Sequence, residues 1–340
     1  MNIVYYNYIL VSMENYNVRK IFLVYNPFSG KKKGEKVFKQ ILPIFEESDI
    51  SVIHKATEYS KHAIDIMKSK DLCFVDAIVV LGGDGTLNEV INGILERDDN
   101  FAIPPLGIVP CGTGNAFATD LGFYQDPIKA VKAIINGYIL KVDCGLVNFK
   151  NLNGFMENRY MLNLVGLGLA VDSNIRAERM RFWGPMRYNV SILLEIFNIK
   201  KKEYTVDINI DNEGEIRQQN CSVIMIQNTK HGGDKMVLAP DAKIDDGYLD
   251  IIYAPKYGRY KMFKLFKKVL DNGKHVTDPN VINRKFKSLI IKSNKKMNIT
   301  LDGENCGTTP INVTVKPQLL KFFMHMPNTE NSIETKSVKI

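Results

Sequence analysis

Few of the residues that build disulfide-rich or zinc-bound domains occur in this sequence. The 340 residues contain five cysteines, an odd number, and no CxxC pair. Neither a disulfide framework nor a zinc site is therefore expected, and isolated thiols fit a reducing cytosol. The longest apolar runs, such as DAIVVLGG, are too short to cross a bilayer, and the N-terminus has no secretory signal pattern. We therefore expect a cytoplasmic protein.

Several common function motifs are also missing. The Walker A pattern GxxxxGK[ST] is absent, and GxGxxG does not occur at the first strand–helix turn, which argues against an ordinary dinucleotide fold. The five histidines fit neither HExxH nor a catalytic triad. No RRM, KH or helix-turn-helix signature is present, so nucleic acid is not an expected partner. The net charge of +8 suits anionic partners such as nucleotides or a membrane surface, or else reflects a solvated lysine-rich surface.

The first part of the chain, residues 19–148, alternates between short apolar strands and amphipathic helices. Such alternation predicts an α/β fold with right-handed crossovers and a largely parallel sheet. Pro43 is expected to kink or end its helix, while Ser60 and Asp126 are expected N-caps. The predicted strands are 20–26, 50–57, 76–83 and 105–112, and the predicted helices are 34–48, 60–70, 86–97 and 126–138.

The second part, residues 149–310, consists of strand-like runs separated by turn signals such as DNEG, DDG and DGENCG. It predicts an antiparallel β-sandwich domain, interrupted by two helical patches at 184–202 and 259–273. Residues 311–326 are expected to complete the first domain. Residues 1–18 are an expected arm, with Met13 as a second candidate start, and residues 327–340 an expected disordered tail.

A glycine-rich turn carries the first functional signal. The run VVLGGDGTLNEV ends a predicted strand in three glycines, Gly82, Gly83 and Gly85, and a helix pattern follows. Glycines let consecutive N–H groups converge on an anion, and the helix N-terminus adds positive charge. Asp84 would repel phosphate unless a cation lay between them, so Mg²⁺ is expected there. The alternative is a tight turn with an incidental acid.

Two further loops follow predicted parallel strands, NPFSGKKKG (26–34) and PCGTGNAFA (110–118). Open α/β sheets bind ligands at this edge. Together with LDGE (301–304), these loops resemble the diacylglycerol kinase catalytic-domain family, which includes bacterial soluble lipid kinases and the sphingosine and ceramide kinases. The resemblance covers about Lys20 to Phe323. NAD kinases share GGDGT, but the four motifs in this order fit lipid kinases better.

The resemblance implies an ATP- and Mg²⁺-dependent lipid kinase. The nucleotide would be lined by Asn26, Pro27, Phe28, Ser29, Gly30, Thr57, Gly83, Asp84, Gly85, Thr86, Leu87, Asn88, Glu89, Thr113 and Glu304. For Thr57, an ordinary hydroxyl at the end of a strand is the alternative.

Magnesium ions would occupy two places by the same resemblance. Asp84 and Asp143 of the joining strand VDCGLVN would hold the catalytic Mg²⁺ through water. The family often has a third acid where this chain has Ala116, and Asp120 is a candidate substitute. A structural Mg²⁺ would bind the turn KIDDGYL through Asp246 and the backbone carbonyls of Lys243 and Tyr248, with a metal-free hairpin turn as the alternative.

The catalytic residue implied by the resemblance is Asp302 of LDGE. A carboxylate there would act as general base, orienting the acceptor hydroxyl as the γ-phosphoryl group transfers. Read alone, Asp-Gly predicts a hairpin turn. The expected product is a phosphatidic-acid-like lipid from a diacylglycerol-like alcohol. The alternatives are a sphingoid base, a polyprenol or NAD as acceptor, or a non-catalytic nucleotide- or lipid-binding regulator.

Membrane contact is the expected partnership. The run KKK (31–33) and the cationic amphipathic pattern at 259–270 suit anionic headgroups at the inner membrane face, although this helix could instead bury its apolar side in the core. Trp183 suits a membrane interface or a core position. The family resemblance also implies a homodimer as a common state.

Overall fold

The computed structural model describes residues 16–69, 71–99, 101–183, 186–198, 204–232 and 236–325. Most of the predicted N-terminal arm, including Met13, and the whole predicted tail lie outside the described residues. Within these ranges, no helix has both the length and the apolar character needed to cross a membrane.

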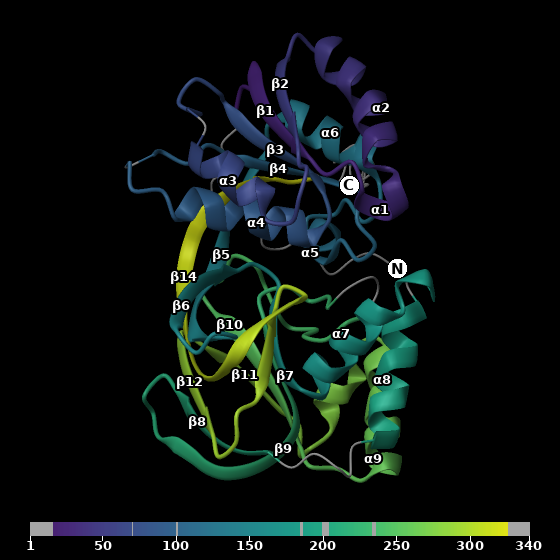
Figure 1. The fold of residues 1–340 in the computed structure, drawn as a ribbon, viewed down its shortest axis with the longest axis vertical. Coiled ribbons are helices and arrows are strands. Elements are labelled where there is room, and N and C mark those ends of the chain that lie inside the picture. The colour runs from purple at the N-terminus through teal and green to yellow at the C-terminus, as the bar shows by residue number, and fades with distance from the viewer. Residues whose placement is uncertain are drawn as a thin grey trace, which may run out of the picture.

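The N-terminal part is a parallel sheet with helices around it (Figure 1). The strands follow the order β2-β1-β3-β4. Strand β3 is buried along its whole length, as expected for a strand covered on both faces. The bounds are β1 Lys20–Tyr25, α1 Ser29–Lys32, α2 Gly34–Glu46, β2 Ser51–Ala56, α3 His62–Ser69, β3 Ala77–Gly82, α4 Asp84–Leu95, β4 Leu106–Pro110, α5 Ala116–Asp120 and α6 Pro127–Asn136.

Helix ends in this part follow the sequence only in some places. Asp126 caps α6 as predicted, because its side chain accepts a hydrogen bond from the Lys129 N–H, with proline at the first helical position. Helix α2 does not end at Pro43 but continues to Glu46. The prediction of Ser60 as an N-cap is wrong. Helix α3 begins at His62, and the Glu89 carboxylate accepts hydrogen bonds from nearby N–H groups.

The C-terminal part is β-rich and mainly antiparallel, with three helices on one side (Figure 1). A mixed α/β fold followed by a β-rich region is therefore confirmed. The bounds are β6 Met156–Met161, β7 Leu164–Gly168, α7 Leu169–Arg179, η1 Arg181–Trp183, α8 Met186–Asn198, β8 Tyr204–Ile210, β9 Glu215–Gln227, β10 Leu249–Pro255, α9 Arg259–Leu270, η3 Lys274–Thr277, β11 Ile282–Phe286, β12 Ser288–Ser293 and β13 Asn298–Leu301.

Helix α7 was not predicted. The run 159–171 reads as a continuous strand because, after Arg159, it is apolar except at Asn163. In the structure, Gly168 has a φ of +70°, and an added Cβ there would lie 2.6 Å from the Ser222 carbonyl oxygen. The chain therefore turns at this glycine from β7 into α7, which only a residue without a Cβ allows.

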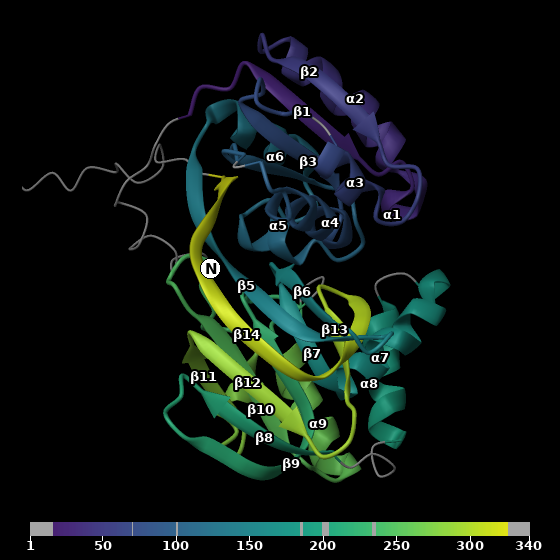
Figure 2. The same ribbon diagram turned by 60° about the vertical axis from the view of Figure 1, so that its left-hand side comes forward.

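Two long strands join the parts. Strand β5 (Ile139–Asn151) and strand β14 (Glu304–Phe323) pair antiparallel along most of their lengths, and β14 curves from one part into the other (Figure 2). Leu320 and Phe322 belong to the N-terminal core, whereas Val313 and Val315 belong to the C-terminal core. The chain thus changes cores within β14, whose C-terminal end pairs in parallel with β4 and adds a strand to the first sheet.

Candidate active site

Two glycine turns meet at the carboxyl edge of the parallel sheet. Gly83 follows β3 and Gly112 follows β4, and a Cβ added to Gly112 would lie 2.5 Å from the Gly83 Cα. The contact therefore requires glycine at position 112, whereas a Cβ added to Gly83 would lie 3.0 Å from the Gly112 Cα, a tight approach. At Gly85, by contrast, an added Cβ would meet nothing within 4 Å among the described residues. This backbone faces open space at the start of α4, where anions are favoured.

Asp84 joins these turns to helix α5. Its carboxylate accepts hydrogen bonds from the Ala116 N–H at 3.0 Å and the Phe117 N–H at 3.2 Å. Burial raises the pKa of Asp84, while both N–H donors and the side chain of Asn163 oppose that shift. The acid therefore fixes the GTGN turn relative to the GGDGT turn.

The NPFSG loop packs behind these turns. The Asn26 N–H donates to the Leu81 carbonyl at 3.0 Å, and the Asn26 side chain reaches Thr86 Oγ1 at 3.5 Å. Gly30 has a φ of +57°, and an added Cβ would lie 2.2 Å from the Cys111 carbonyl oxygen. Phe28 is well exposed. Leu87, expected to line the nucleotide, has no exposed surface and belongs to the core, so its side chain does not line the cavity.

Asp302 lies in the turn between β13 and β14, with a φ of +45°. One carboxylate oxygen accepts from Asn88 Nδ2 at 2.7 Å and from the Leu162 N–H at 2.8 Å. The other accepts from the N–H groups of Asn163 at 2.9 Å and Leu164 at 2.8 Å. A carboxylate offers about four acceptor positions, so all of them are in use. Burial raises the pKa of Asp302 to about 6, despite these four donors.

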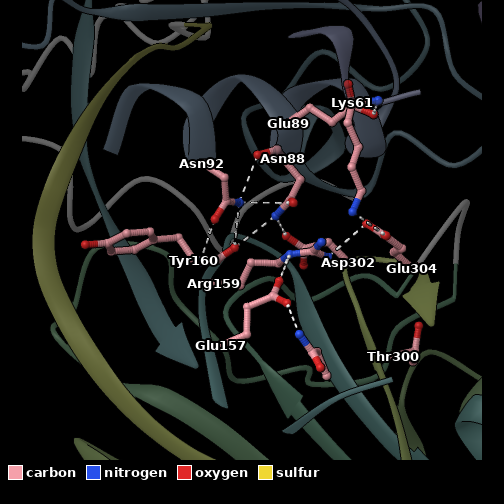
Figure 3. A network of polar contacts seen from close by, with 12 residues as sticks. Lys61, Asn88, Glu89, Asn92, Glu157, Arg159, Tyr160, Thr300, Asp302 and Glu304 are labelled. Atoms are coloured by element: carbon pink, nitrogen blue, oxygen red, sulfur yellow. Dashed lines mark hydrogen bonds and ion pairs between the residues drawn. The ribbon is translucent and has the colours of Figure 1, made fainter. Parts of the chain in front are cut away.

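The same residues connect the two parts of the molecule. From α4, Asn88 and Asn92 donate to the Tyr160 carbonyl at 3.0 and 3.1 Å, and the Tyr160 N–H donates to Asn92 Oδ1 at 2.8 Å (Figure 3). Asn88, predicted to line the nucleotide, thus also links α4 to β6 and to Asp302. The position of Asp302 relative to the glycine turns is set by this network.

Charged side chains surround Glu304 at the edge of the network (Figure 3). Arg159 Nη1 donates to Glu304 at 2.9 Å, and Lys61 Nζ lies 3.8 Å from the same carboxylate. Burial raises the pKa of Glu89, the N–H groups of Lys61 and Ala63 oppose this, and the charge of Glu304 raises it further. Lys61 and Arg159 supply positive charge that the sequence patterns did not single out.

Asp143 lies at the turn predicted to bind the structural Mg²⁺. Its carboxylate accepts from the N–H groups of Gly247 at 2.6 Å and Gln318 at 2.7 Å. Burial raises the pKa of Asp143, and the charges of Asp246 and Asp245 raise it further. The contacts of Asp84 are with α5 and Asn163, so the two acids expected to share one Mg²⁺ are engaged with different segments.

Asp246 is paired with a lysine. Lys285 Nζ contacts its carboxylate and lies 4.0 Å from Asp250 Oδ2. Across the described ranges, no group of three or more His, Cys, Asp or Glu side chains is arranged to hold a metal. The residues present therefore provide a carboxylate and an ammonium here rather than a preformed side-chain cage. At the catalytic end, a metal would depend on water and phosphate oxygens for most of its ligands.

Asp120, the candidate substitute for the missing third acid, has partners of its own. It accepts from the Lys230 N–H at 2.6 Å, and its other oxygen lies 2.5 Å from His231 Nδ1. It lies at the C-terminal end of α5, whereas Asp84 contacts the N-terminal end. Asp120 thus fastens α5 to the loop after β9.

One cavity of about 790 Å³ runs from the glycine turns into the C-terminal part. This volume is in the usual range for a small-molecule site. Helices α8 and α9 and strands β9 and β10 enclose its apolar end with Ile196, Met225, Ile252, Met262, Leu265 and Phe266. Of the predicted residues, Gly83, Asp84, Gly85, Asn88, Glu89, Thr113, Asp302 and Glu304 line it.

The other residues predicted to bind the nucleotide lie outside this cavity. Asn26–Gly30, Thr57 and Thr86 do not line this cavity, and Thr57 is a buried residue whose N–H continues the pairing of β2 with β1. Asn163 and Asn174 line the cavity and were missed. Asn163 lies in a mostly apolar run and Asn174 in the mixed polar sequence of α7, and neither context signals a site.

Comparisons with known proteins agree with this geometry. The diacylglycerol kinase catalytic domain matches residues 20–147, and the YegS C-terminal NAD kinase beta sandwich-like domain matches residues 163–324. A diacylglycerol kinase from Staphylococcus carnosus (strain TM300) is 31% identical over 294 residues, covering 85% of this chain and 90% of the relative. One from Staphylococcus saprophyticus subsp. saprophyticus is 30% identical over 321 residues, covering 93% and 97%.

A solved structure also matches this chain over most of its length. A proposed diacylglycerol kinase from Bacillus anthracis str. Sterne is 25% identical, with a TM-score of 0.74, and the match covers 92% of this chain and 97% of that one. Sequence identity and fold therefore agree over nearly the whole of both proteins. The chain belongs to the diacylglycerol kinase family of lipid kinases.

Proposed function

We propose that this chain transfers the γ-phosphoryl group of ATP to the hydroxyl of a diacylglycerol-like lipid, giving a phosphatidic-acid-like product and ADP. The observation that carries the proposal is that one cavity combines two chemically different ends. It has glycine turns and carboxylates at one end and aliphatic side chains at the other. A soluble acceptor such as NAD would leave that apolar end unfilled, whereas acyl chains would bury it.

The nucleotide fits the polar end of the cavity on physical grounds. Gly85 leaves the backbone at the start of α4 open, and a triphosphate is favoured at such a helix N-terminus. Lys61 lies 3.8 Å from the carboxylate of Glu304, which lines the cavity, and so adds positive charge at the edge of this end. Asp84 would contact Mg²⁺ through water, and the ion would supply charge neutralisation on the phosphates.

A substrate panel tests this function. Purified protein with Mg²⁺ and ATP would be offered diacylglycerols, sphingoid bases, a polyprenol and NAD, and phosphorylated products would be measured by mass spectrometry. We expect turnover with diacylglycerols. Turnover of NAD alone would show that the chain is a kinase of a soluble alcohol, and ATP binding without any product would indicate a regulator.

We also propose that the protein docks peripherally on an anionic membrane surface, at the cytoplasmic face. Large apolar side chains are exposed on η1, α8 and α9: Phe182, Trp183, Met186, Phe197, Tyr260 and Leu270. Lys264 and Lys267 of α9 lie 4.5 Å and 4.9 Å above the rings of Tyr260 and Phe263. Apolar side chains beside lysines suit an interface with anionic headgroups. The inner sides of α8 and α9 line the cavity, which would give a lipid a short path into it.

Vesicle sedimentation tests the docking. The protein should bind vesicles of phosphatidylcholine with phosphatidylserine more tightly than phosphatidylcholine alone, and added salt should weaken binding. Replacing Phe182 and Phe197 with serine should lower binding to the mixed vesicles. Phe155 on the β5–β6 turn is also well exposed, so Phe155→Ser is the matched control and should leave binding unchanged.

A further inference from the structure

Asn163 lies between two of the carboxylates that line the cavity, those of Asp84 and Asp302. It lies in the short turn from β6 to β7, is only 3% exposed, and lines the cavity together with Asp84 and Asp302. None of the four sequence motifs includes it. A polar side chain so deeply buried needs a reason, because transfer from water is unfavourable unless its polar atoms are paired.

The backbone of Asn163 is held from both sides. Its N–H donates to Asp302 Oδ1 at 2.9 Å, and its carbonyl accepts from the Asn228 N–H at 2.9 Å. The N–H groups of Leu162 and Leu164 donate to the same Asp302 carboxylate, each at 2.8 Å. Asp302 therefore fixes three consecutive residues, with Asn163 at their centre.

The nitrogen and the oxygen of the Asn163 side-chain amide have different surroundings. The side chain lies near Asp84 and opposes the rise in the pKa of that acid, which indicates that the NH₂ group faces the ionised carboxylate. This orientation leaves Oδ1 on the other side. Although Oδ1 is buried, no residue of the described chain hydrogen-bonds to it. A buried acceptor without a partner is rare and points to a missing ligand.

Asp302 cannot readily take the role of direct partner for a substrate hydroxyl. Its four acceptor positions are filled by Asn88 and by residues 162–164, so a hydroxyl would have to displace one of these donors. Two acceptors that line the cavity lack a donor in the described chain, Asn163 Oδ1 and Asn305 Oδ1. Of the two, Asn163 is the residue whose backbone N–H donates to Asp302 and which is only 3% exposed.

We propose that Asn163 Oδ1 accepts a hydrogen bond from the hydroxyl of the lipid alcohol and so orients its oxygen toward the phosphate end of the cavity. Asp302 is then a positioning residue, which holds the turn that carries Asn163. The proposal rests on the function proposed above and names the group that recognises the acceptor alcohol. An amide is not a base, so the proposal concerns orientation only.

The experiment compares two ligands in the absence of nucleotide. One is a short-chain diacylglycerol, and the other is the same molecule with hydrogen in place of its free hydroxyl. Wild-type protein should bind the alcohol about 5-fold more tightly, the size of one neutral hydrogen bond. In Asn163→Ala this preference should vanish, while affinity for the deoxy lipid stays close to wild type. If the alanine variant does not fold, Asn163→Leu keeps the side-chain volume and serves instead.

Controls separate this role from a structural one. Met262 lines the apolar end of the same cavity, so Met262→Ala should weaken both ligands by the same factor. Asp302→Asn, which loosens the turn, should also reduce the preference for the hydroxyl. Retention of the preference in both Asn163 variants would overturn the proposal.

Two further outcomes have distinct meanings. Equal binding of both lipids by wild-type protein that still phosphorylates diacylglycerol would reject the Asn163 assignment and leave the proposed function standing. Absence of both lipid binding and lipid turnover would reject the function, and the assignment with it. Weaker Mn²⁺ binding by Asn163→Ala without lipid, followed by electron paramagnetic resonance, would make Oδ1 a metal ligand and also overturn the assignment.

Discussion

The two ends of the cavity are built in opposite ways. At the phosphate end, backbone groups and short polar side chains are fixed by hydrogen bonds from distant parts of the chain, such as Asp302 to Asn88 and to residues 162–164. At the lipid end, aliphatic side chains of α8, α9, β9 and β10 enclose the space. The first end depends on the position of single atoms, whereas the second depends on volume and hydrophobicity.

This difference predicts different sensitivities to mutation. A single polar substitution at the phosphate end should abolish most activity, because buried donors would lose their partners. Substitutions at the lipid end should instead change which lipids fit. The experiments below are arranged from the largest expected effect to the smallest.

Asp302→Asn should have the largest effect, lowering kcat/KM about 10³-fold. The amide replaces one accepting oxygen with a donor, which then faces N–H groups of residues 162–164 or the Asn88 amide. Steady-state kinetics with diacylglycerol measures it. Asp211→Asn is the matched control, since Asp211 also accepts two backbone hydrogen bonds, from Lys287 and Ser288, outside the cavity. A smaller loss for Asp302 than for Asp211 would contradict the contrast between the two ends.

Gly85→Val should lower ATP affinity roughly 100-fold with little change in Tm. An added Cβ there meets no described residue within 4 Å, so the side chain would extend into the space proposed for phosphate. Nucleotide binding by calorimetry and a melting curve measure the two quantities. Gly258, also open within the described chain and away from the cavity, gives the control Gly258→Ala. Unchanged ATP binding in Gly85→Val would place the nucleotide elsewhere.

Ala254→Phe should act at the lipid end and raise KM for long-chain diacylglycerol about 10-fold. Ala254 is buried on β10 and lines the cavity, so a larger side chain would shorten the space for acyl chains. The KM for ATP should stay constant, and short-chain lipids should remain substrates. An equal rise in KM for lipids of all acyl-chain lengths would mean that this end of the cavity does not select lipids by chain length.

Activity should fall about 10-fold for each pH unit below about 6, because the pKa of Asp302 is raised to about 6 and protonation removes an acceptor. Lowering the pH has the opposite effect on the free energy of unfolding, which the titration of Asp302 raises. The pKa of Asp302 is higher in the folded chain than in the unfolded chain, so between pH 6 and 4 proton uptake by this group favours folding. A pH–rate profile measured beside a melting curve at each pH separates the two effects. In Asp302→Asn, the fall below pH 6 should disappear.

Lys285→Met should have the smallest effect, lowering Tm by about 2 °C without Mg²⁺. The substitution removes the ammonium beside Asp246 and Asp250, and the pKa of Asp250 is raised to about 6 by burial. We propose that Mg²⁺ can replace the lysine at this turn and so should raise the Tm of the variant more than that of the wild type. Equal shifts in both proteins would mean that the lysine and the ion do not compete.

Local sequence patterns were sufficient for most of the first part of the fold. Three of the four strands of the parallel sheet, β1, β3 and β4, are short apolar runs, and the longer helices carry their own periodicity, so neighbouring residues contain the needed information. The cap at Asp126 is of the same kind. The short helices α1 and α5 carry no such periodicity and were not predicted. The start of α3 was missed because its cap, Glu89, comes from another helix. Helix α7 was missed because its first turn is as apolar as the strand before it.

The sequence by itself determined the glycine turns and their order, because each turn directly follows a short apolar strand and glycine lets backbone N–H groups converge. The close approach of Gly112 to Gly83 was set by the tertiary structure. Tertiary structure alone decided which acids meet. Asp302 contacts a segment about 140 residues earlier, and Asp143 joins the Gly247 turn rather than α5. No periodicity within one segment encodes such pairings, since they arise when β5 and β14 bring the two cores together. The same pairing places Asn163 between Asp84 and Asp302.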